Sequence, residues 1–548
     1  MAKIALVLSG GSSLGAYIGG AVTEVFLALR RNAADDRVTI DVITGTSAGA
    51  LTAGILARTL VVNPHTLPWI RTAWVDAVDA RALLDPTRAN RLGGLDASVV
   101  EDLTEALITA EPASDDHVSP VAGDPLRVGL TLAGLDGIRY DAPIGFRNEP
   151  GRHYGTRVFA DSIAFDLTRG TGAGDRVWES LRQAALASSA FPFAFPPRGI
   201  VRFPGDYPGA RLPPGSDDGF LRWYADGGLF DNAPVGLAKH LVERDPGYRG
   251  EDWRYVLVEP TMRAGADDVP AAEREPRSVS DLGARLAGAV LGQSAAKDWA
   301  RARDVNRRLA ILRALVEQLP DLQDRLEDPE AVGLGRQIGN LAERVAEIVV
   351  NEAGPIDGAE LEEAALDRLE SAVDRIESDP SYATAFGRLE TRAGRARLAK
   401  LIFVLESVGK LSEKADMPLY LVAPRTSGEL AGSCLGNFGG FLRREWRESD
   451  FRAGRRDARR LLEGPLGDII RYEPDEDEAY EPAAGTPSWE DVPPDTRRQL
   501  ERALAAEADR LLEEVRSGPV AALFGWAWKP AVRRWIVGRA LEALRESC

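Results

Sequence analysis

The chain has 548 residues, 44% hydrophobic and 28% charged, a length that allows more than one domain and a composition typical of globular proteins. Its formal net charge of −17 argues against a nucleic-acid partner, which would need a basic surface, and disfavours broad contact with an anionic membrane. The two cysteines, Cys434 and Cys548, are too few for a disulfide framework and lack metal-site spacing, which favours a reducing compartment such as the cytoplasm. We find no run of the roughly twenty apolar residues that a membrane span requires, and we expect neither a metal nor an organic cofactor.

The chain begins with an apolar run, Ile4-Ala5-Leu6-Val7-Leu8, which is shorter than the apolar core of a secretory signal and predicts a buried first strand. The loop that follows, Gly10-Gly11-Ser12-Ser13-Leu14-Gly15, leads into a helical pattern. Backbone N–H groups at such a helix start can bind a phosphate or stabilise an oxyanion. The loop lacks the lysine of a P-loop and the third glycine of a dinucleotide-binding turn, which leaves an oxyanion site or a plain tight turn.

A second strand-to-helix connection carries the candidate nucleophile. The β-branched run Val42-Ile43-Thr44 is followed by Gly45-Thr46-Ser47-Ala48-Gly49 and then by small, helix-forming residues. This order predicts a nucleophile elbow, in which Gly45 and Gly49 permit a sharp, strained turn that projects the hydroxyl of Ser47 above the sheet. The five-residue pattern alone is common, and a glycine-rich turn with a solvent-facing serine is the alternative.

The candidate acid comes later in the chain. After a helix predicted over 178–190, the aromatic and proline-rich segment 191–197 is apolar enough to line an acyl pocket or to pack beneath the sheet edge. Asp226 then ends a predicted strand, directly before Gly227 and Gly228. Such a turn is common as plain turn chemistry, but beside a serine with no obvious histidine partner Asp226 is the natural candidate for the general base.

Together these motifs resemble the patatin-like phospholipases, a family of serine acyl hydrolases, over roughly residues 1 to 262. The resemblance rests on the order of the glycine-rich loop, Gly-x-Ser-x-Gly, the segment Ala187-Ser188-Ser189-Ala190-Phe191-Pro192, and Asp-Gly-Gly. It implies an α/β fold with a three-layer α/β/α core, and a catalytic dyad in which Asp226 activates Ser47. It also implies an oxyanion hole made by backbone N–H groups of the glycine-rich loop: Gly10, Gly11, Ser12, Ser13 and Gly15.

A catalytic triad is the alternative to the dyad, because the chain order Ser47, Asp226, His240 matches the order of serine, acid and histidine in α/β-hydrolases. His240 is expected in a helix that begins near Pro234, about two turns from the Asp226 loop, so a surface or core role is favoured. The remaining histidines have weaker cases, since they lie beside a proline or in polar loops: His65, His117 and His153.

Beyond the resemblance the pattern is mainly helical. We expect the catalytic domain at 1–262, a mainly α-helical insertion at 263–417, a segment at 418–472 that returns to the core, an acidic, proline-rich linker at 473–494 and a C-terminal helical region at 495–548. The C-terminal region places tryptophans beside arginines, which suits either peripheral contact with a membrane or a docked terminal helix.

The resemblance implies a lipid acyl hydrolase of the phospholipase A or lysophospholipase type, with a lipid or acyl ester as substrate. The loop departs from the family's usual Gly-Gly-Gly-x-Arg/Lys-Gly at two positions, with Ser12 in place of the third glycine and Leu14 in place of the basic residue. A patatin-fold binding or scaffold protein with weak activity is therefore an alternative, as is an acyltransferase or thioesterase that uses the same serine. We expect a cytoplasmic protein, with peripheral membrane binding as a further option.

Overall fold

The computed structural model leaves residues 474–487 of the expected linker, and the C-terminal Trp526, Trp528 and Trp535, outside the residues that it describes. The proposed membrane contact through the C-terminal helix therefore falls outside the described part of the chain. The described residues are 2–32, 38–62, 67–84, 94–109, 118–143, 153–192, 194–245, 247–248, 251–262, 301–317, 326, 332–353, 359–411, 417–426, 429–473, 488–517, 533–534 and 537–538.

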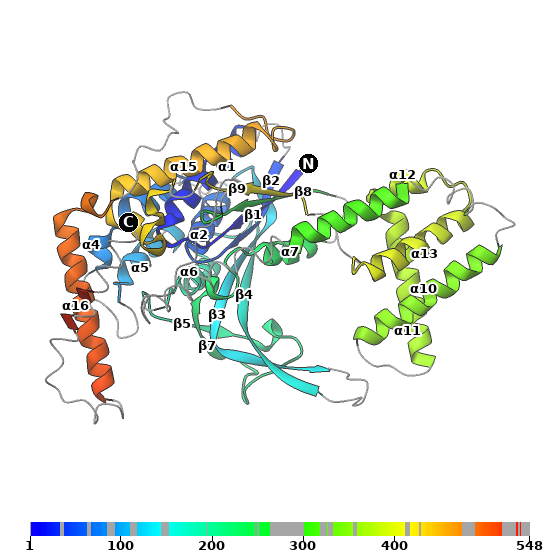
Figure 1. Cartoon of the computed structure of the whole chain (residues 1–548), viewed down its shortest axis with the longest axis horizontal. Coiled ribbons are helices and arrows are strands. Elements are labelled where there is room, and N and C mark those ends of the chain that lie inside the picture. The colour runs from blue at the N-terminus through cyan, green and yellow to red at the C-terminus, as the bar shows by residue number, and fades with distance from the viewer. Residues whose placement is uncertain are drawn as a thin grey trace.

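A nine-stranded mixed sheet forms the centre of the molecule, in the order β5-β7-β3-β2-β1-β8-β9, with β4 and β6 paired to β3 (Figure 1). Strands β3, β2, β1, β8 and β9 are parallel, and the others are antiparallel to their partners. Leu8 lies opposite both Gly45 and Val258, so three strands end at one level. The strands are β1 (Ala2–Leu8), β2 (Val38–Gly45), β3 (Ala122–Pro143), β4 (His153–Leu167), β5 (Arg198–Arg202), β6 (Ala210–Arg211), β7 (Phe220–Asp226), β8 (Asp252–Val258) and β9 (Leu419–Val422).

Helices cover both faces of this sheet. On one face, α1 (Gly15–Arg31), α2 (Ala48–Val61), α6 (Arg176–Ser188) and α15 (Arg444–Glu463) share a core with the strands. On the other face, α7 (Val235–Glu243) packs with Ala302, at the start of the helical residues 301–317. The expected three-layer α/β/α fold is therefore confirmed.

The first strand shows why the sequence produces this arrangement. Ile4, Leu6 and Leu8 belong to the core on one face, whereas Ala5 and Val7 belong to the core on the other, and all five are fully buried. A parallel strand covered on both faces has no polar side, so its sequence is a continuous apolar run.

Short helical segments lie between β2 and β3, near the end of α2. They include α3 (Pro68–Arg71), the π-helical turn Thr72–Ala77, α4 (Ala80–Leu83), α5 (Ser98–Thr104) and the π-helical turn Glu105–Thr109. Leu83 and Ile108 bury their side chains almost completely, so these segments close one side of the helical layer.

One described helix, Ser12–Arg31, is long and apolar enough by length and composition to cross a membrane, so the expectation of no such stretch is wrong. Its mean hydropathy is high because it consists largely of small and apolar residues. These residues pack in the interior, and 89% of the helix's most apolar window is buried inside the structure. The helix therefore has the surroundings of a core helix.

Helices α1 and α15 lie with their backbones in direct contact. A Cβ added at Gly20 would lie 2.0 Å from the carbonyl oxygen of Phe451, and one added at Gly454 would lie 2.0 Å from that of Tyr17. Beside this contact the hydroxyl of Tyr17 donates to Asp457 Oδ2 at 3.1 Å. Residues separated by more than 400 positions thus form one helical layer.

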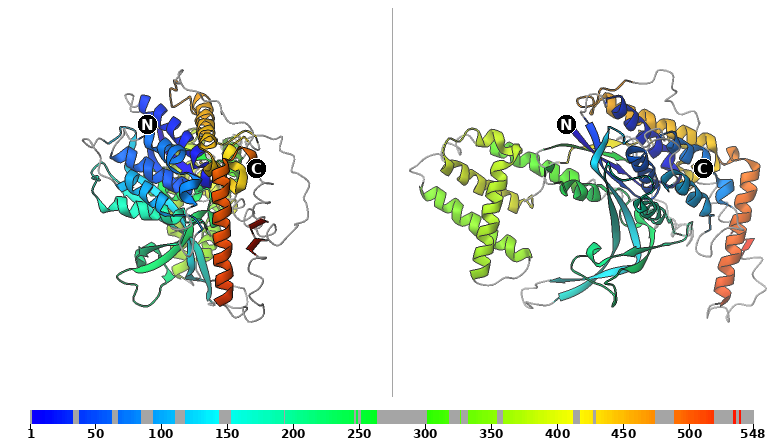
Figure 2. Two further views of the ribbon diagram at one scale, coloured as in Figure 1. Left: turned by 90° about the vertical axis from the view of Figure 1, so that its left-hand side faces the viewer. Right: turned by 180° about the vertical axis from the view of Figure 1, so that it is seen from behind.

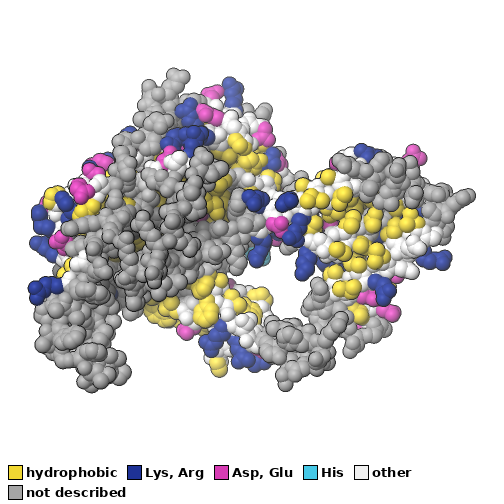
Figure 3. All heavy atoms as spheres, viewed as in Figure 1, with side chains coloured by type: hydrophobic (Ala, Val, Ile, Leu, Met, Phe, Trp, Pro, Cys, Tyr) yellow, Lys and Arg dark blue, Asp and Glu magenta, His cyan; other side chains and the backbone are white. Residues whose placement is uncertain are grey.

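The helical residues after β8 form a second body at the side of the sheet (Figures 1 and 2). Its own core includes Leu369, Ile402 and Phe403. Apolar residues also gather on its surface, among them Ile348, 59% exposed, and Val408, 75% exposed (Figure 3). The body is made of residues 301–317, α10 (Val332–Ala353), α11 (Ala359–Ser378), α12 (Ala383–Phe386) and α13 (Arg392–Val408).

The chain then returns to the sheet, where β9 pairs with β8 in parallel. The short helix α14 (Cys434–Asn437) and α15 follow, and α16 (Pro494–Ser517) lies at the end of the molecule remote from the second helical body (Figure 1). Cys434 is disulfide-bonded, an outcome that the number of cysteines did not predict. The domain boundaries given above remain a proposal about how these parts divide.

Gly454→Ala tests the backbone contact between α1 and α15. Because the new methyl group would have to displace the carbonyl group of Tyr17, we expect the free energy of unfolding to fall by about 1–3 kcal/mol. Gly339→Ala, on α10, is the matched control, since nothing lies within 4 Å of its added Cβ and alanine has about 1 kcal/mol better helix propensity than glycine. Urea unfolding followed by tryptophan fluorescence measures both, and equal stability of the two variants would contradict the contact.

Candidate active site

The turn between β2 and α2 holds Ser47 in a strained backbone conformation. Its φ of 53° and ψ of −121° lie where residues with a side chain are rare. A Cβ added at Gly45 would lie 2.5 Å from the carbonyl oxygen of Gly49, and one added at Gly49 would lie 2.2 Å from that of Leu8. Both glycines are therefore required by the close approach of the backbone, and the turn has the geometry expected of a nucleophile elbow.

Asp226 ends β7 with its side chain buried in the protein, 2% exposed. Its Oδ1 accepts a hydrogen bond from the N–H of Gly228 at 2.8 Å, whereas Oδ2 accepts none from the described residues. Burial raises the pKa of Asp226 to about 6, while the nearby hydroxyl of Ser47 and the N–H of Gly228 act in the opposite direction. The hydroxyl of Ser47 is thus close enough to influence Asp226, although their contact falls short of hydrogen-bond geometry.

The glycine-rich loop passes beside this pair. A Cβ added at Gly10 would lie 3.2 Å from Cβ of Ser47. The N–H of Gly10 already donates to the carbonyl oxygen of Asn232 at 3.0 Å, and that of Gly15 bonds to the carbonyl oxygen of Ser12. These two N–H groups are occupied. Three others donate no hydrogen bond among the described residues and remain candidates for an oxyanion: those of Gly11, Ser12 and Ser13.

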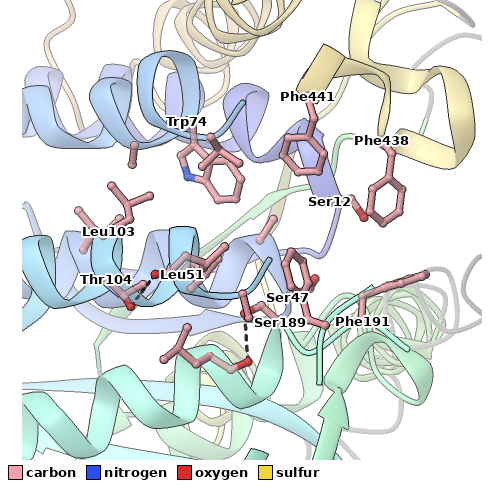
Figure 4. Close-up of a pocket in the computed structure, with 18 of the residues that line it drawn as sticks. Ser12, Ser47, Leu51, Trp74, Leu103, Thr104, Ser189, Phe191, Phe438 and Phe441 are labelled. Carbon is pink, nitrogen blue, oxygen red and sulfur yellow. Dashed lines mark hydrogen bonds between the residues drawn. The ribbon is translucent and has the colours of Figure 1, made fainter. Parts of the chain in front are cut away.

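An apolar cavity extends from this site (Figure 4). Ser47, Ser12 and Phe191 lie at one end, and Leu103 and Thr104 lie at the other. The one charged side chain among the described lining residues is Arg198, which forms an ion pair with Glu101. The other lining residues are Ala48, Leu51, Ile55, Ala73, Trp74, Val78, Ala97, Val100, Leu186, Ser189, Phe195, Phe438 and Phe441.

His240 lies elsewhere. It is on α7, against the opposite face of the sheet, where it lines a polar pocket with Asp161, Tyr207 and Arg222. No contact joins it to Ser47 or Asp226 among the residues that the structure describes, so the triad is not assembled. Within the same residues, no group of three or more His, Cys, Asp or Glu side chains is arranged to hold a metal ion.

Comparison with known proteins finds a family that matches the part of the chain that carries these turns. The family model of the patatin-like phospholipases matches residues 6–239. These residues form a patatin-like phospholipase domain. The Gly-x-Ser-x-Gly turn and the Asp-Gly-Gly turn both lie within the match.

Two curated relatives are similar to part of the chain. An uncharacterized membrane protein, Rv3479 of Mycobacterium tuberculosis, is 27% identical over 283 residues, which cover 49% of this chain and 25% of that protein. An uncharacterized protein, y4iI of Sinorhizobium fredii, is 24% identical over 323 residues, covering 44% of this chain and 46% of that protein. The chain thus spans less than half the length of either relative.

Among solved structures, the ExoU-SpcU heterodimer from the type III secretion system of Pseudomonas aeruginosa is 15% identical. The alignment covers 97% of this chain and 89% of that chain, with a TM-score of 0.17. This score is too low for that structure to inform the site.

In the patatin-like domain of this chain, Leu14 stands where the family's loop usually has a basic residue. Its side chain is 1% exposed and belongs to the hydrophobic core. Leu14 therefore contributes packing and cannot supply a charge to the site.

Two residues beside Ser47 were not predicted as site residues. The hydroxyl of Ser188 accepts a hydrogen bond from the N–H of Ser47 at 3.1 Å, and the carbonyl group of Asn232 holds Gly10. Ser188 lies in the Ala-Ser-x-Ala-Phe-Pro motif, and Asn232 follows the Asp-Gly-Gly turn. Both motifs could have suggested a supporting role.

The strain at position 47 can be measured with two variants that lack the hydroxyl. Ser47→Ala keeps a Cβ in the strained conformation, whereas Ser47→Gly removes it. We expect the glycine variant to have the higher free energy of unfolding, by roughly 1 kcal/mol, because relief of strain exceeds the entropy cost of glycine. Thermal and urea unfolding compare the two, and a less stable glycine variant would show that the turn is unstrained.

Proposed function

We propose that the chain hydrolyses carboxylic esters of lipids through an acyl-enzyme at Ser47, with Asp226 as the general base. The observation that carries this proposal is the position of a strained serine beside a buried carboxylate that keeps one oxygen without a hydrogen bond, at the end of an apolar cavity. Lipid hydrolysis is what the patatin-like family implies, and an apolar cavity suits an acyl chain.

The reaction proceeds in two halves. Asp226 takes the proton of the Ser47 hydroxyl as the serine oxygen attacks the ester carbonyl carbon. The free N–H groups of Gly11, Ser12 and Ser13 are the proposed donors to the oxyanion. Collapse of the tetrahedral intermediate expels the alcohol, which receives the proton from Asp226, and leaves an acyl-serine. Water, deprotonated by Asp226, then attacks this ester, and collapse releases a fatty acid while Asp226 returns the proton to the serine oxygen.

Labelling with a fluorophosphonate, followed by mass spectrometry of the adduct, tests the nucleophile. We expect the wild-type protein to be labelled at Ser47, Ser47→Ala not to be labelled, and Asp226→Asn to react about 100-fold more slowly because it lacks the base. Lipid esters that differ in head group and chain length would follow, with alcohol and thiol acceptors added to detect acyl transfer. A folded wild-type protein that is neither labelled nor active would favour the scaffold alternative.

The pH dependence of kcat/KM tests the base. A pKa of about 6 means that Asp226 is mostly protonated below this pH and ionised above it. Because only the ionised form can accept the serine proton, kcat/KM on a soluble ester should rise through pH ~6 and level off by pH ~7. A midpoint near pH ~4 would indicate that the carboxylate is not buried during the reaction.

A further inference from the structure

Residues 431–442, which we call the strap, lie outside the family match but contact the loop beside Ser47. The strap follows β9, precedes α15 and packs against the turn Ser12–Leu14. It consists of a 3-10 turn at Ala431–Ser433, α14 and a second 3-10 turn at Gly439–Leu442.

The contact centres on the side chain of Ser13, which is fully buried. Its hydroxyl donates to the carbonyl oxygen of Asn437 at 2.7 Å and accepts from the N–H of Gly440 at 3.0 Å. The carbonyl oxygen of Gly432 lies 3.4 Å away as a second acceptor. One hydroxyl group is thus enclosed by backbone groups that lie more than 400 positions later in the chain.

Two glycines make this enclosure tight. A Cβ added at Gly440 would lie 2.8 Å from Oγ of Ser13, and one added at Gly432 would lie 3.0 Å from the same atom. Any side chain at either position would push against Ser13. The strap therefore approaches the loop with its backbone, and the fit leaves Ser13 little freedom to move.

Helix α15 holds the strap at both ends. Both carboxylate oxygens of Asp450 accept backbone N–H groups, from Ala431 at 2.7 Å and from Gly432 at 2.8 Å. Arg447, 1% exposed, donates through Nη1 to the carbonyl oxygens of Gly440 at 3.0 Å and Phe441 at 3.2 Å. Unmade hydrogen bonds of such buried groups are costly, so the strap is fixed relative to the core.

The strap also reaches the cavity itself. Phe438 and Phe441 line it, and the ring of Phe438 contacts that of Phe191 with a centroid distance of 5.4 Å (Figure 4). Ser12, next to Ser13, lines the same end and has a φ of 48°, a conformation that needs support from its surroundings.

We propose that Ser13 is a positioning residue whose side chain, enclosed by the strap, holds the N–H groups of Gly11 to Ser13 toward the oxyanion formed at Ser47. This inference rests on the proposed acyl-serine mechanism and extends the active site beyond the family match. The strap stabilises the transition state more than the bound substrate, because the oxyanion exists only in the former.

Ser13→Ala removes the hydroxyl group alone. We expect kcat to fall roughly 10- to 100-fold with KM changed less than about 3-fold, because the oxyanion donors lose their fixed positions. Phosphonylation of Ser47 should slow by a similar factor. Thr23→Val, in α1, is the matched control, since it also removes a buried hydroxyl, bonded to the carbonyl oxygen of Gly19, and should react like the wild type.

Gly440→Ala tests the same contact from the strap, without touching the loop sequence. It should lower kcat and the phosphonylation rate as Ser13→Ala does, and the double variant should lose less than the product of the two single losses, because removing Oγ makes room for the new methyl group. Thermal unfolding establishes that each variant is folded at the assay temperature.

The outcomes separate the two proposals. If the wild type is labelled at Ser47 while folded Ser13→Ala and Gly440→Ala react within about 2-fold of it, the positioning role is wrong and the proposed function stands. An increase in KM with kcat unchanged in both variants would also overturn the positioning role, since it would indicate that Ser13 acts in substrate binding. A wild type that is not labelled overturns both proposals together.

Discussion

The close approach between the end of β1 and the start of α2 sets the geometry of the whole site. The carbonyl oxygen of Leu8 accepts the N–H of Thr46 at 3.1 Å and lies where any side chain at Gly49 would have to be. Leu8 is also the residue after which the chain turns into the loop of Gly10 to Gly15. One backbone contact thus fixes the proposed nucleophile and the proposed oxyanion donors relative to each other. The strain at Ser47 persists because β2 is buried along its whole length, and β1 at every residue except Lys3, so the backbone cannot relax.

The treatment of charge differs between the site and the rest of the fold. In the layer of α1 and α15, buried acids meet basic side chains: Glu24 is paired with the buried Arg455, and Asp457 with the buried Arg456 and the partly exposed Arg460. Within α15, the ion pairs of Arg455 and Arg456 lie in the interior. At the site, Asp226 has no hydrogen bond on Oδ2 among the described residues, and its raised pKa expresses the cost of burial. The burial of Asp226 therefore lowers the stability of the fold at the position of the proposed base.

The sequence was sufficient for features that are local. The elbow at 45–49 follows from glycine spacing and from the change from β-branched to small residues. The alternation of buried strands with helices predicts an α/β fold, whereas its three layers were implied by the family resemblance. The site assignments for Ser47 and Asp226 remain predictions that the geometry supports. Features that depend on contacts between residues far apart in the chain have no local sequence pattern from which they could be predicted. The hydrogen bond from the N–H of Gly10 to the carbonyl oxygen of Asn232, and the acceptors of the Ser13 hydroxyl, are examples.

The order of segments along the chain has a consequence for how the protein is made. Strand β8 ends at Val258, and its parallel neighbour β9 begins only at Leu419, so the second helical body is synthesised between two strands that lie side by side. The groups that enclose Ser13 are translated later still. A nascent chain that has emerged only through β8 contains both Ser47 and Asp226, yet its loop has none of the acceptors supplied by the strap. Under the proposed mechanism and the proposed role of Ser13, the emerging domain gains its full reactivity only after the ribosome has translated the strap, which delays ester cleavage until most of the chain has been made.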